Sequence, residues 1–238
     1  MPEPTTLTVP TPDGAMPAHL WLPRAGSGPG ILLLQEIFGV SAYIRSRAAD
    51  LAGLGYVVLA PELYWRAADA EVDETREDFL EQAMGIAGSL DWETTVADTV
   101  AALGTLAERP EVTGGTGVLG FCYGGGLAFH VAAVAEVDAL IAYYGSAIPS
   151  LLHLADEVGA PSLHILGGDD AFLPDDLADR LRQTGGQVET HVHDGAGHAF
   201  DNPHPAFHHP EASAAAWRQT EDFLARHLPA GSGLTRTM

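Results

Sequence analysis

The chain has 238 residues, of which 46% are hydrophobic, so it is long enough for one large α/β domain with a sizeable core. Its formal net charge of -21, with no lysine, opposes binding to nucleic acid or to anionic membrane surfaces. The sequence contains no run of 18 apolar residues and no signal-peptide pattern, and its single cysteine allows no internal disulfide, so we expect a cytoplasmic protein.

The first sixty residues alternate between strand and helix patterns. Turn residues Pro12-Asp13-Gly14 separate two short strand patterns and predict an N-terminal hairpin. An unbroken apolar run at 31–34 predicts a buried central strand. We expect strands at 5–9, 18–22, 31–34 and 56–60, a loop over 23–30, and a helix from Ser41 to about Leu54.

The middle of the chain begins with an acidic stretch. Residues 69–81 carry seven acids against one arginine, Arg76, which favours a solvated helix face. Residues 93–108 have apolar side chains at helical spacing, which predicts an amphipathic helix. The inward-facing positions of this helix would be Val96, Val100, Leu103 and Leu106.

The last hundred residues continue the alternation. We expect strands at 139–144, 162–166 and 187–192, helices from Pro174 to Gly185-Gly186 and over 211–227, and a frayed tail at 229–238. Such alternation predicts an α/β fold with a mostly parallel central sheet and helices on both faces. No internal repeat or long linker divides the chain, so residues 1–238 are expected to form a single domain.

Glycines surround the only cysteine of the chain. Gly120-Phe-Cys122-Tyr-Gly124 follows a short apolar run and precedes residues at helical spacing. This is the Gly-x-nucleophile-x-Gly pattern of a sharp strand-turn-helix elbow, with cysteine in place of the usual serine. A Cβ at Gly120 or Gly124 would crowd that turn. A buried structural cysteine is the alternative, which the surrounding glycines disfavour.

Four reactive residues fall just after predicted strand ends: Glu36, Cys122, Asp170 and His198. Ligands bind beyond the carboxyl ends of the strands in such sheets, so these residues form a candidate site. The chain order of nucleophile, acid and histidine is that of the α/β-hydrolase fold. Asp169 competes with Asp170 for the role of the acid, since either could instead cap the turn before Pro174.

At this point the sequence resembles the dienelactone hydrolase family. The matching pieces span nearly the whole chain in family order: Gln35-Glu36-Ile37-Phe38-Gly39, Ala60-Pro61-Glu62-Leu63-Tyr64, Gly120-Phe-Cys122-Tyr-Gly-Gly, Gly167-Gly-Asp-Asp170-Ala-Phe-Leu-Pro174 and Gly197-His198-Ala-Phe200. In the family the acid lies four residues before the proline, which selects Asp170 over Asp169. The resemblance implies an α/β-hydrolase fold and no metal or organic cofactor.

The resemblance also implies roles for the site residues. Cys122 would attack a lactone or ester carbonyl to form a thioester, with His198 as base and acid and Asp170 orienting it. The oxyanion would meet the backbone N–H groups of Ile37 and Tyr123. The carboxylate of Glu36 would contact the resting thiol and help to release the thiolate when substrate arrives.

The substrate-binding positions implied by the resemblance are Phe38, Tyr64, Leu80 and Asn202. Well-known members bind a substrate carboxylate with two arginines, and Leu80 and Asn202 stand where these are expected. We therefore expect a small ester or lactone substrate that is neutral, unless Arg66 or Arg76 replaces the missing cations.

Other functions stay open at this stage. A thioesterase or peptidase could use the same triad, and a non-catalytic member of the fold is conceivable. Six histidines crowd residues 191–209, and His191 and His193 would share one strand face, as metal ligands can, which leaves a metal-binding protein or metallohydrolase as a further alternative. No acidic or cysteine partner at ligand spacing accompanies them. We expect no nucleic-acid or membrane partner, and a monomer or weak dimer.

Overall fold

The computed structural model describes residues 3–67 and 72–231 and contains one eight-stranded sheet in the order β1-β2-β4-β3-β5-β6-β7-β8. The β1–β2 and β2–β4 pairs are antiparallel, and every other pair is parallel. The strands are β1 (Thr5–Thr11), β2 (Gly14–Trp21), β3 (Gly28–Leu34), β4 (Val57–Pro61), β5 (Val112–Phe121), β6 (Ala139–Tyr143), β7 (Ser162–Gly167) and β8 (Val188–His193).

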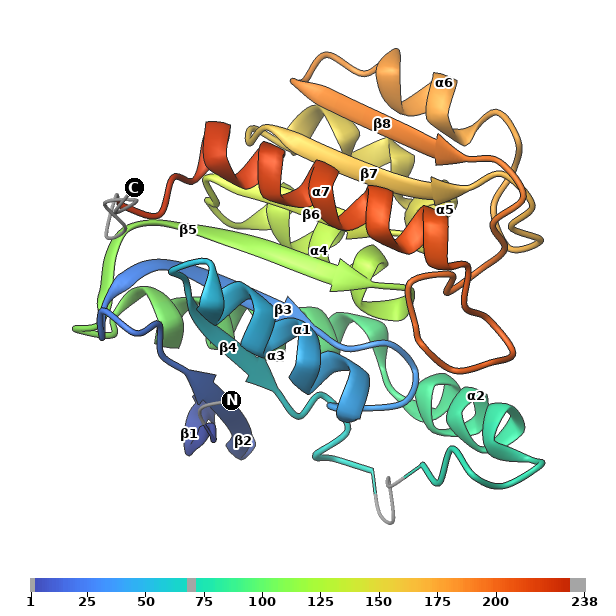
Figure 1. Cartoon of the computed structure of the whole chain (residues 1–238). Helices are drawn as coiled ribbons and strands as arrows, with labels where there is room; N and C mark the ends of the chain where they lie inside the picture. Colours follow the sequence, from blue (N-terminus) through green and yellow to red (C-terminus); the bar gives the residue numbers. More distant parts are fainter. Residues whose placement is uncertain (1–2, 68–71, 232–238) are drawn as a thin grey trace, which may run out of the picture.

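Helices cover both faces of this sheet (Figure 1). Helices α1 and α7 pack in front of the sheet in that view, and α3 and α4 pack behind it. The helices are α1 (Ala42–Gly53), α2 (Phe79–Ser89), α3 (Trp92–Ala107), α4 (Tyr123–Val134), α5 (Ile148–Leu151), the 3-10 helix η1 (Leu152–Glu157), α6 (Leu177–Arg182) and α7 (Pro210–His227). The predicted α/β fold, with a mostly parallel sheet between two layers of helices, is confirmed.

The central strands are apolar along their whole length because both of their faces are covered. Every residue of β3, β4 and β6 is buried, as expected for parallel strands between two layers of helices. Strands β3, β5, β6, β7 and β8 run in the same direction, so the segments that follow them meet at one edge of the sheet. That edge carries the candidate site.

The loop predicted over 23–30 is wrong in its second half, because β3 already begins at Gly28. A Cβ on Gly28 would lie 2.1 Å from the carbonyl oxygen of Gly55, and one on Gly30 would press against Leu106. Gly28, one of the glycines that suggested a loop, is therefore required by the close approach of a neighbouring segment to the strand.

The solvated helix predicted over 69–81 is wrong for residues 72–78, whereas residues 79–81 are helical and belong to α2. Residues 72–78 form turns, and α2 begins only at Phe79. Asp73 caps one of these turns by accepting hydrogen bonds from the backbone and hydroxyl of Thr75, which offers the backbone an alternative to a helix. Asp69 and Glu71 lie outside the described residues.

Smaller differences concern the C-terminal half. The helix expected from Pro174 is limited to Leu177–Arg182, and α5 and η1 were not predicted. In the tail, residues 229–231 have no regular structure, and the rest of the tail lies outside the described residues. Within the described ranges, no helix is both long enough and apolar enough to cross a membrane.

Candidate active site

The elbow between β5 and α4 holds Cys122 in a strained conformation. Its φ of 52° and ψ of -112° are unusual for a residue other than glycine. The Cys122 N–H donates to the carbonyl of Tyr143 at 3.0 Å. A Cβ on Gly120 would lie 1.9 Å from the Gly124 carbonyl oxygen, and one on Gly124 would lie 2.4 Å from that of Gln35. The two glycines are thus needed for the tight turn, as predicted.

The structure brings Cys122, His198 and Asp170 into one line. The distance from His198 Nε2 to the sulfur of Cys122 is 3.0 Å, and His198 Nδ1 donates to Asp170 Oδ2 at 2.8 Å. The second oxygen of Asp170 accepts from the backbone N–H of Phe172 at 2.9 Å, which fixes the carboxylate. Asp169 is exposed to solvent. It is Asp170, and not Asp169, that contacts His198 in this geometry.

The surroundings of His198 favour its protonated form. Burial lowers the pKa of His198, but the hydrogen bonds to Asp170 and Cys122 outweigh this effect and raise that pKa to about 10. Cys122 stands at the N-terminus of α4, where the helix dipole stabilises negative charge on a neighbouring sulfur. A protonated His198 beside the sulfur of Cys122 is what this arrangement favours.

Glu36 lies at the end of β3, with only 1% of its surface exposed. Its carboxylate accepts from the Tyr144 hydroxyl at 3.1 Å and from Asn202 Nδ2 at 2.7 Å. Burial raises the pKa of Glu36 to about 7, against the lowering effect of these two hydrogen bonds. Among the described residues, Glu36 and Cys122 share no hydrogen bond, so the expected contact with the thiol is not formed in this conformation.

Two backbone N–H groups are available near the nucleophile. Ile37 and Tyr123 follow Glu36 and Cys122, and within the described residues neither N–H donates to another backbone carbonyl. The Ile37 carbonyl accepts from the Tyr64 hydroxyl at 2.9 Å. Gln35 accepts from the N–H of Leu63 at 3.3 Å, which ties the same loop to the segment after β4. These contacts hold the Ile37 loop in place.

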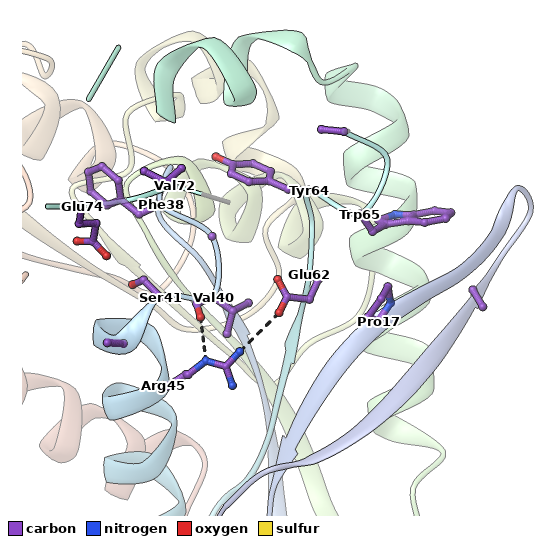
Figure 2. Close-up of a pocket in the computed structure, with 14 residues that line it drawn as sticks. Pro17, Phe38, Val40, Ser41, Arg45, Glu62, Tyr64, Trp65, Val72 and Glu74 are labelled. Carbon is purple, nitrogen blue, oxygen red and sulfur yellow. Dashed lines mark hydrogen bonds and ion pairs between the residues drawn. The ribbon is translucent and has the colours of Figure 1, made fainter. Parts of the chain in front are cut away.

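The four predicted substrate-binding residues have different environments. Phe38 and Tyr64 are buried and line a cavity of about 800 Å³, which Figure 2 shows beside Arg45 and Glu62. Cys122 and His198 are not among the described residues that line it. Leu80 is exposed on α2. Asn202 is buried and both ends of its amide are engaged, because its Nδ2 donates to Glu36 and its Oδ1 accepts from the N–H of His204.

The two arginines considered as replacement cations are paired elsewhere. The guanidinium of Arg66 donates two hydrogen bonds at 2.9 Å to buried Asp98 and one at 2.8 Å to Asp13. Arg76 pairs with Asp78 on the exposed surface. Neither arginine is free to receive a substrate anion in this conformation.

Sequence reasoning missed two aromatic residues beside His198. The Tyr144 ring lies 5.2 Å from the imidazole in an edge-on arrangement, and its φ is 35°. The Phe172 ring lies 4.8 Å away, although the residue is 63% exposed. Tyr144 directly follows β6, and Phe172 lies within the motif that contains Asp170. These two positions were the signals in the sequence that could have identified them.

Sequence reasoning also missed a buried polar chain behind the site. The Tyr144 hydroxyl lies 3.4 Å from that of Tyr43, which donates to Asp201. Asp201 is bound in turn by two nitrogens of Arg47, at 2.8 and 2.6 Å. No motif in the sequence predicts these contacts, because Asp201 is 158 residues from Tyr43 and 154 residues from Arg47.

The histidines of the C-terminal third do not converge. His193 is within hydrogen-bond distance of Gln219, and His209 caps α7 by accepting from the N–H of Ala212. Within the part of the chain that the structure describes, no three His, Cys, Asp or Glu residues form a group that could hold a metal ion.

Comparisons with known proteins agree with this geometry. Residues 16–228 match the sequence profile of the dienelactone hydrolase family. A carboxymethylenebutenolidase of Pseudomonas sp. (strain P51) is 34% identical over 223 residues, covering 92% of this chain and 93% of the relative. One of Pseudomonas putida is 34% identical over 207 residues, covering 85% and 88%.

Solved structures give the same result for the fold. A crystal structure from Klebsiella pneumoniae superposes with a TM-score of 0.82 at 27% identity, covering 94% of this chain and 98% of that chain. A Pyrococcus horikoshii acylaminoacyl peptidase, 16% identical, superposes with a TM-score of 0.73 over 97% of this chain, so the fold is that of the α/β-hydrolases. With its profile match and its relatives, the chain belongs to the dienelactone hydrolase family.

Proposed function

We propose that the protein hydrolyses small carboxylic esters or lactones, with Cys122 as the nucleophile, His198 as base and acid, and Asp170 as the residue that orients His198. The observation that carries this proposal is the continuous line of contacts from Asp170 through His198 to the sulfur, at 2.8 and 3.0 Å. The name shared by the relatives, carboxymethylenebutenolidase, supports a lactone as the substrate class.

In the first half of the reaction the sulfur of Cys122 attacks the carbonyl carbon and forms a C–S bond. The carbonyl oxygen becomes an oxyanion, which the N–H groups of Ile37 and Tyr123 would stabilise. Preorganised donors of this kind are worth about 3 kcal/mol each. The intermediate collapses to a thioester, and the leaving alkoxide takes the Nε2 proton of His198.

In the second half water replaces the alcohol. Neutral His198 removes a proton from water, which attacks the thioester carbonyl, and the C–S bond breaks to release the carboxylic acid. The thiolate and the imidazolium are then restored, so protons balance over the cycle. Asp170 keeps the Nδ1 proton in place throughout and stabilises the imidazolium.

A hydrolysis screen tests this proposal against the thioesterase and peptidase alternatives. Wild type, Cys122→Ala and Cys122→Ser would be assayed on lactones, neutral esters, thioesters and peptides. We expect the highest kcat/KM on lactones or esters, no turnover by Cys122→Ala, and an acyl mass on Cys122 after rapid quenching. Hydrolysis by Cys122→Ala at the wild-type rate would refute the proposal.

A further inference from the structure

A chain of buried polar groups runs from the active-site edge of the sheet to α1. It joins Glu36, Tyr144, Tyr43, Asp201 and Arg47. Only 1% of the surface of Glu36 and of Asp201 is exposed, and Tyr43 and Tyr144 are also buried. Water therefore does not readily replace any partner among these polar groups. The hydrogen bonds that the groups make with one another can be counted one by one.

The direction of the chain is fixed at the Asp201 end. Arg47 donates two hydrogen bonds to Asp201, and the Ser213 hydroxyl donates a third at 2.6 Å. An ionised carboxylate can only accept, so the hydroxyl of Tyr43 has to donate to Asp201. The oxygen of Tyr43 is then left as an acceptor for Tyr144.

Both tyrosine hydroxyls keep their protons. Burial raises the pKa of Tyr43 and of Tyr144 well above the ordinary value. Three links join Glu36, Tyr144, Tyr43 and Asp201, but the two hydroxyls supply only two protons. A third proton has to come from Glu36 if every link is to be a hydrogen bond.

With Glu36 ionised, Tyr144 donates to its carboxylate and no proton remains for the link between the tyrosines. The two hydroxyl oxygens are 3.4 Å apart, longer than the usual 2.7–2.8 Å of an O–H···O hydrogen bond. With Glu36 protonated, Glu36 donates to Tyr144, Tyr144 donates to Tyr43, and Tyr43 donates to Asp201. All three links are then filled.

We propose that Asp201 is a positioning residue for the reaction: by holding the proton of Tyr43, it directs the hydroxyl chain so that the chain is complete only when Glu36 is protonated. This inference rests on the proposed function for its catalytic meaning. Tyr144 packs against His198, and the charge of Glu36 acts on the same imidazole. A neutral Glu36 removes one negative charge from the surroundings of His198.

The other groups that face Glu36 do not supply the missing proton. Asn202 donates an amide hydrogen to Glu36 whether the carboxyl group is ionised or not. His198 favours the carboxylate through its positive charge, whereas the charge of Asp201 favours the neutral acid. Among the described contacts of Glu36, the Tyr144 link is the one whose direction has to reverse when Glu36 takes up a proton.

Infrared difference spectroscopy across a pH titration tests the inference without any substrate. The infrared band of a protonated carboxyl group that disappears in Glu36→Gln is assigned to Glu36. The pH midpoint of this band is then measured in Tyr43→Phe. This variant keeps the ring that packs on Phe121. The bond from Tyr43 to Asp201 is lost in both states of Glu36, but the bond from Tyr144 to Tyr43 is lost from the protonated state alone, so we expect the midpoint to fall by about half to one pH unit.

Tyr143→Phe is the matched control, because the buried hydroxyl of Tyr143 bonds to Thr220, and neither residue belongs to the chain of polar groups. In a second variant, Asp201→Asn, Tyr43 can turn to Tyr144 and the charge of Asp201 is lost, and both changes should lower the midpoint. A midpoint that stays or rises in Tyr43→Phe, or that falls equally in Tyr143→Phe, would overturn the inference. Because no turnover is measured, failure of the proposed hydrolysis would leave this readout unaffected.

Discussion

Replacing Glu36 by glutamine should stabilise the protein at alkaline pH and change its stability little at acid pH. The Glu36 carboxyl is buried with two polar partners, Tyr144 and Asn202. A glutamine at this position can accept from Asn202 and donate to Tyr144, as a protonated glutamic acid does. The substitution therefore removes the cost of a buried negative charge while keeping the hydrogen bonds of the neutral state.

The sign and size of the effect follow from the pKa of Glu36. Burial raises it from 4.5 to about 7, so the folded protein holds this proton more tightly than the unfolded chain does. The corresponding stability is fully present below about pH 4.5 and is lost as the pH rises through about 7. At about 1.4 kcal/mol for each pKa unit, wild type loses about 3 kcal/mol relative to Glu36→Gln across this window.

Urea unfolding of both proteins between pH 5 and pH 9 measures this difference in the free energy of unfolding. The contributions of the other titrating groups are common to both proteins and largely cancel. Glu189→Gln is a matched control, because Arg226 lowers the pKa of Glu189 through hydrogen bonds and charge. A lowered pKa gives stability that is present above the unfolded value and lost on acidification, so this control should show no alkaline gain. A difference between wild type and Glu36→Gln that is flat across this pH range would refute the reasoning.

Three further predictions concern the site. Asp170→Asn should lower kcat by orders of magnitude and Asp169→Asn far less, and equal losses in steady-state kinetics would identify the wrong carboxylate. Peroxide should inactivate Glu36→Gln faster than wild type, because an ionised carboxylate disfavours the thiolate; faster loss in wild type would contradict this. Gly120→Ala should fail to fold or melt far below wild type. Gly104→Ala on α3 should not, because a Cβ there meets nothing within 4 Å. Similar melting temperatures for the two variants would count against the elbow packing.

The parts of the fold that could be predicted are those specified by local sequence. Unbroken apolar runs such as 31–34 marked the buried strands, and the glycines around Cys122 marked the elbow, because both patterns express constraints between near neighbours. The start of β3 was missed because Gly28 is needed for the approach of Gly55, which belongs to another segment. Such a contact between segments leaves no local pattern.

The candidate site also contains residues that could be predicted from the sequence and residues that could not. Cys122, Asp170 and His198 follow strand ends, so the direction of a parallel sheet was enough to place them at one edge. The chain through Tyr43 and Asp201 could not be predicted, since 158 residues separate these two partners. Asn202 was assigned to substrate binding, but the structure shows that its amide is already used by Glu36 and by the backbone of His204.

The charge of the preferred substrate is the remaining prediction, and it depends on which cations can reach the site. The resemblance to the family implies that Leu80 and Asn202 stand where carboxylate-binding arginines are expected. Arg66 is held by Asp98 and Asp13, and its guanidinium lies 4.2 Å from the centroid of the Trp65 ring. Moving Arg66 toward the nucleophile would leave buried Asp98 without its ion-pair partner, which is unfavourable.

Neither Arg66 nor Arg76 would therefore pair with an anionic lactone at the site. The loss of such a partner typically costs about 2 kcal/mol or more, which corresponds to roughly 30-fold in affinity. The net charge of -21 gives an anion no help, although screening limits that field beyond about 8 Å. We expect neutral esters or lactones to have the higher kcat/KM.

The assay compares kcat/KM for one lactone scaffold as its free acid and as its methyl ester or amide. The variants Arg66→Ala and Arg76→Ala are measured on both forms. If both variants still have the higher kcat/KM on the neutral form, the prediction of a neutral substrate is supported, because neither arginine then contributes to binding. A clear preference of wild type for the anion would contradict it, and the variant that abolishes that preference would identify the arginine that had moved into the site.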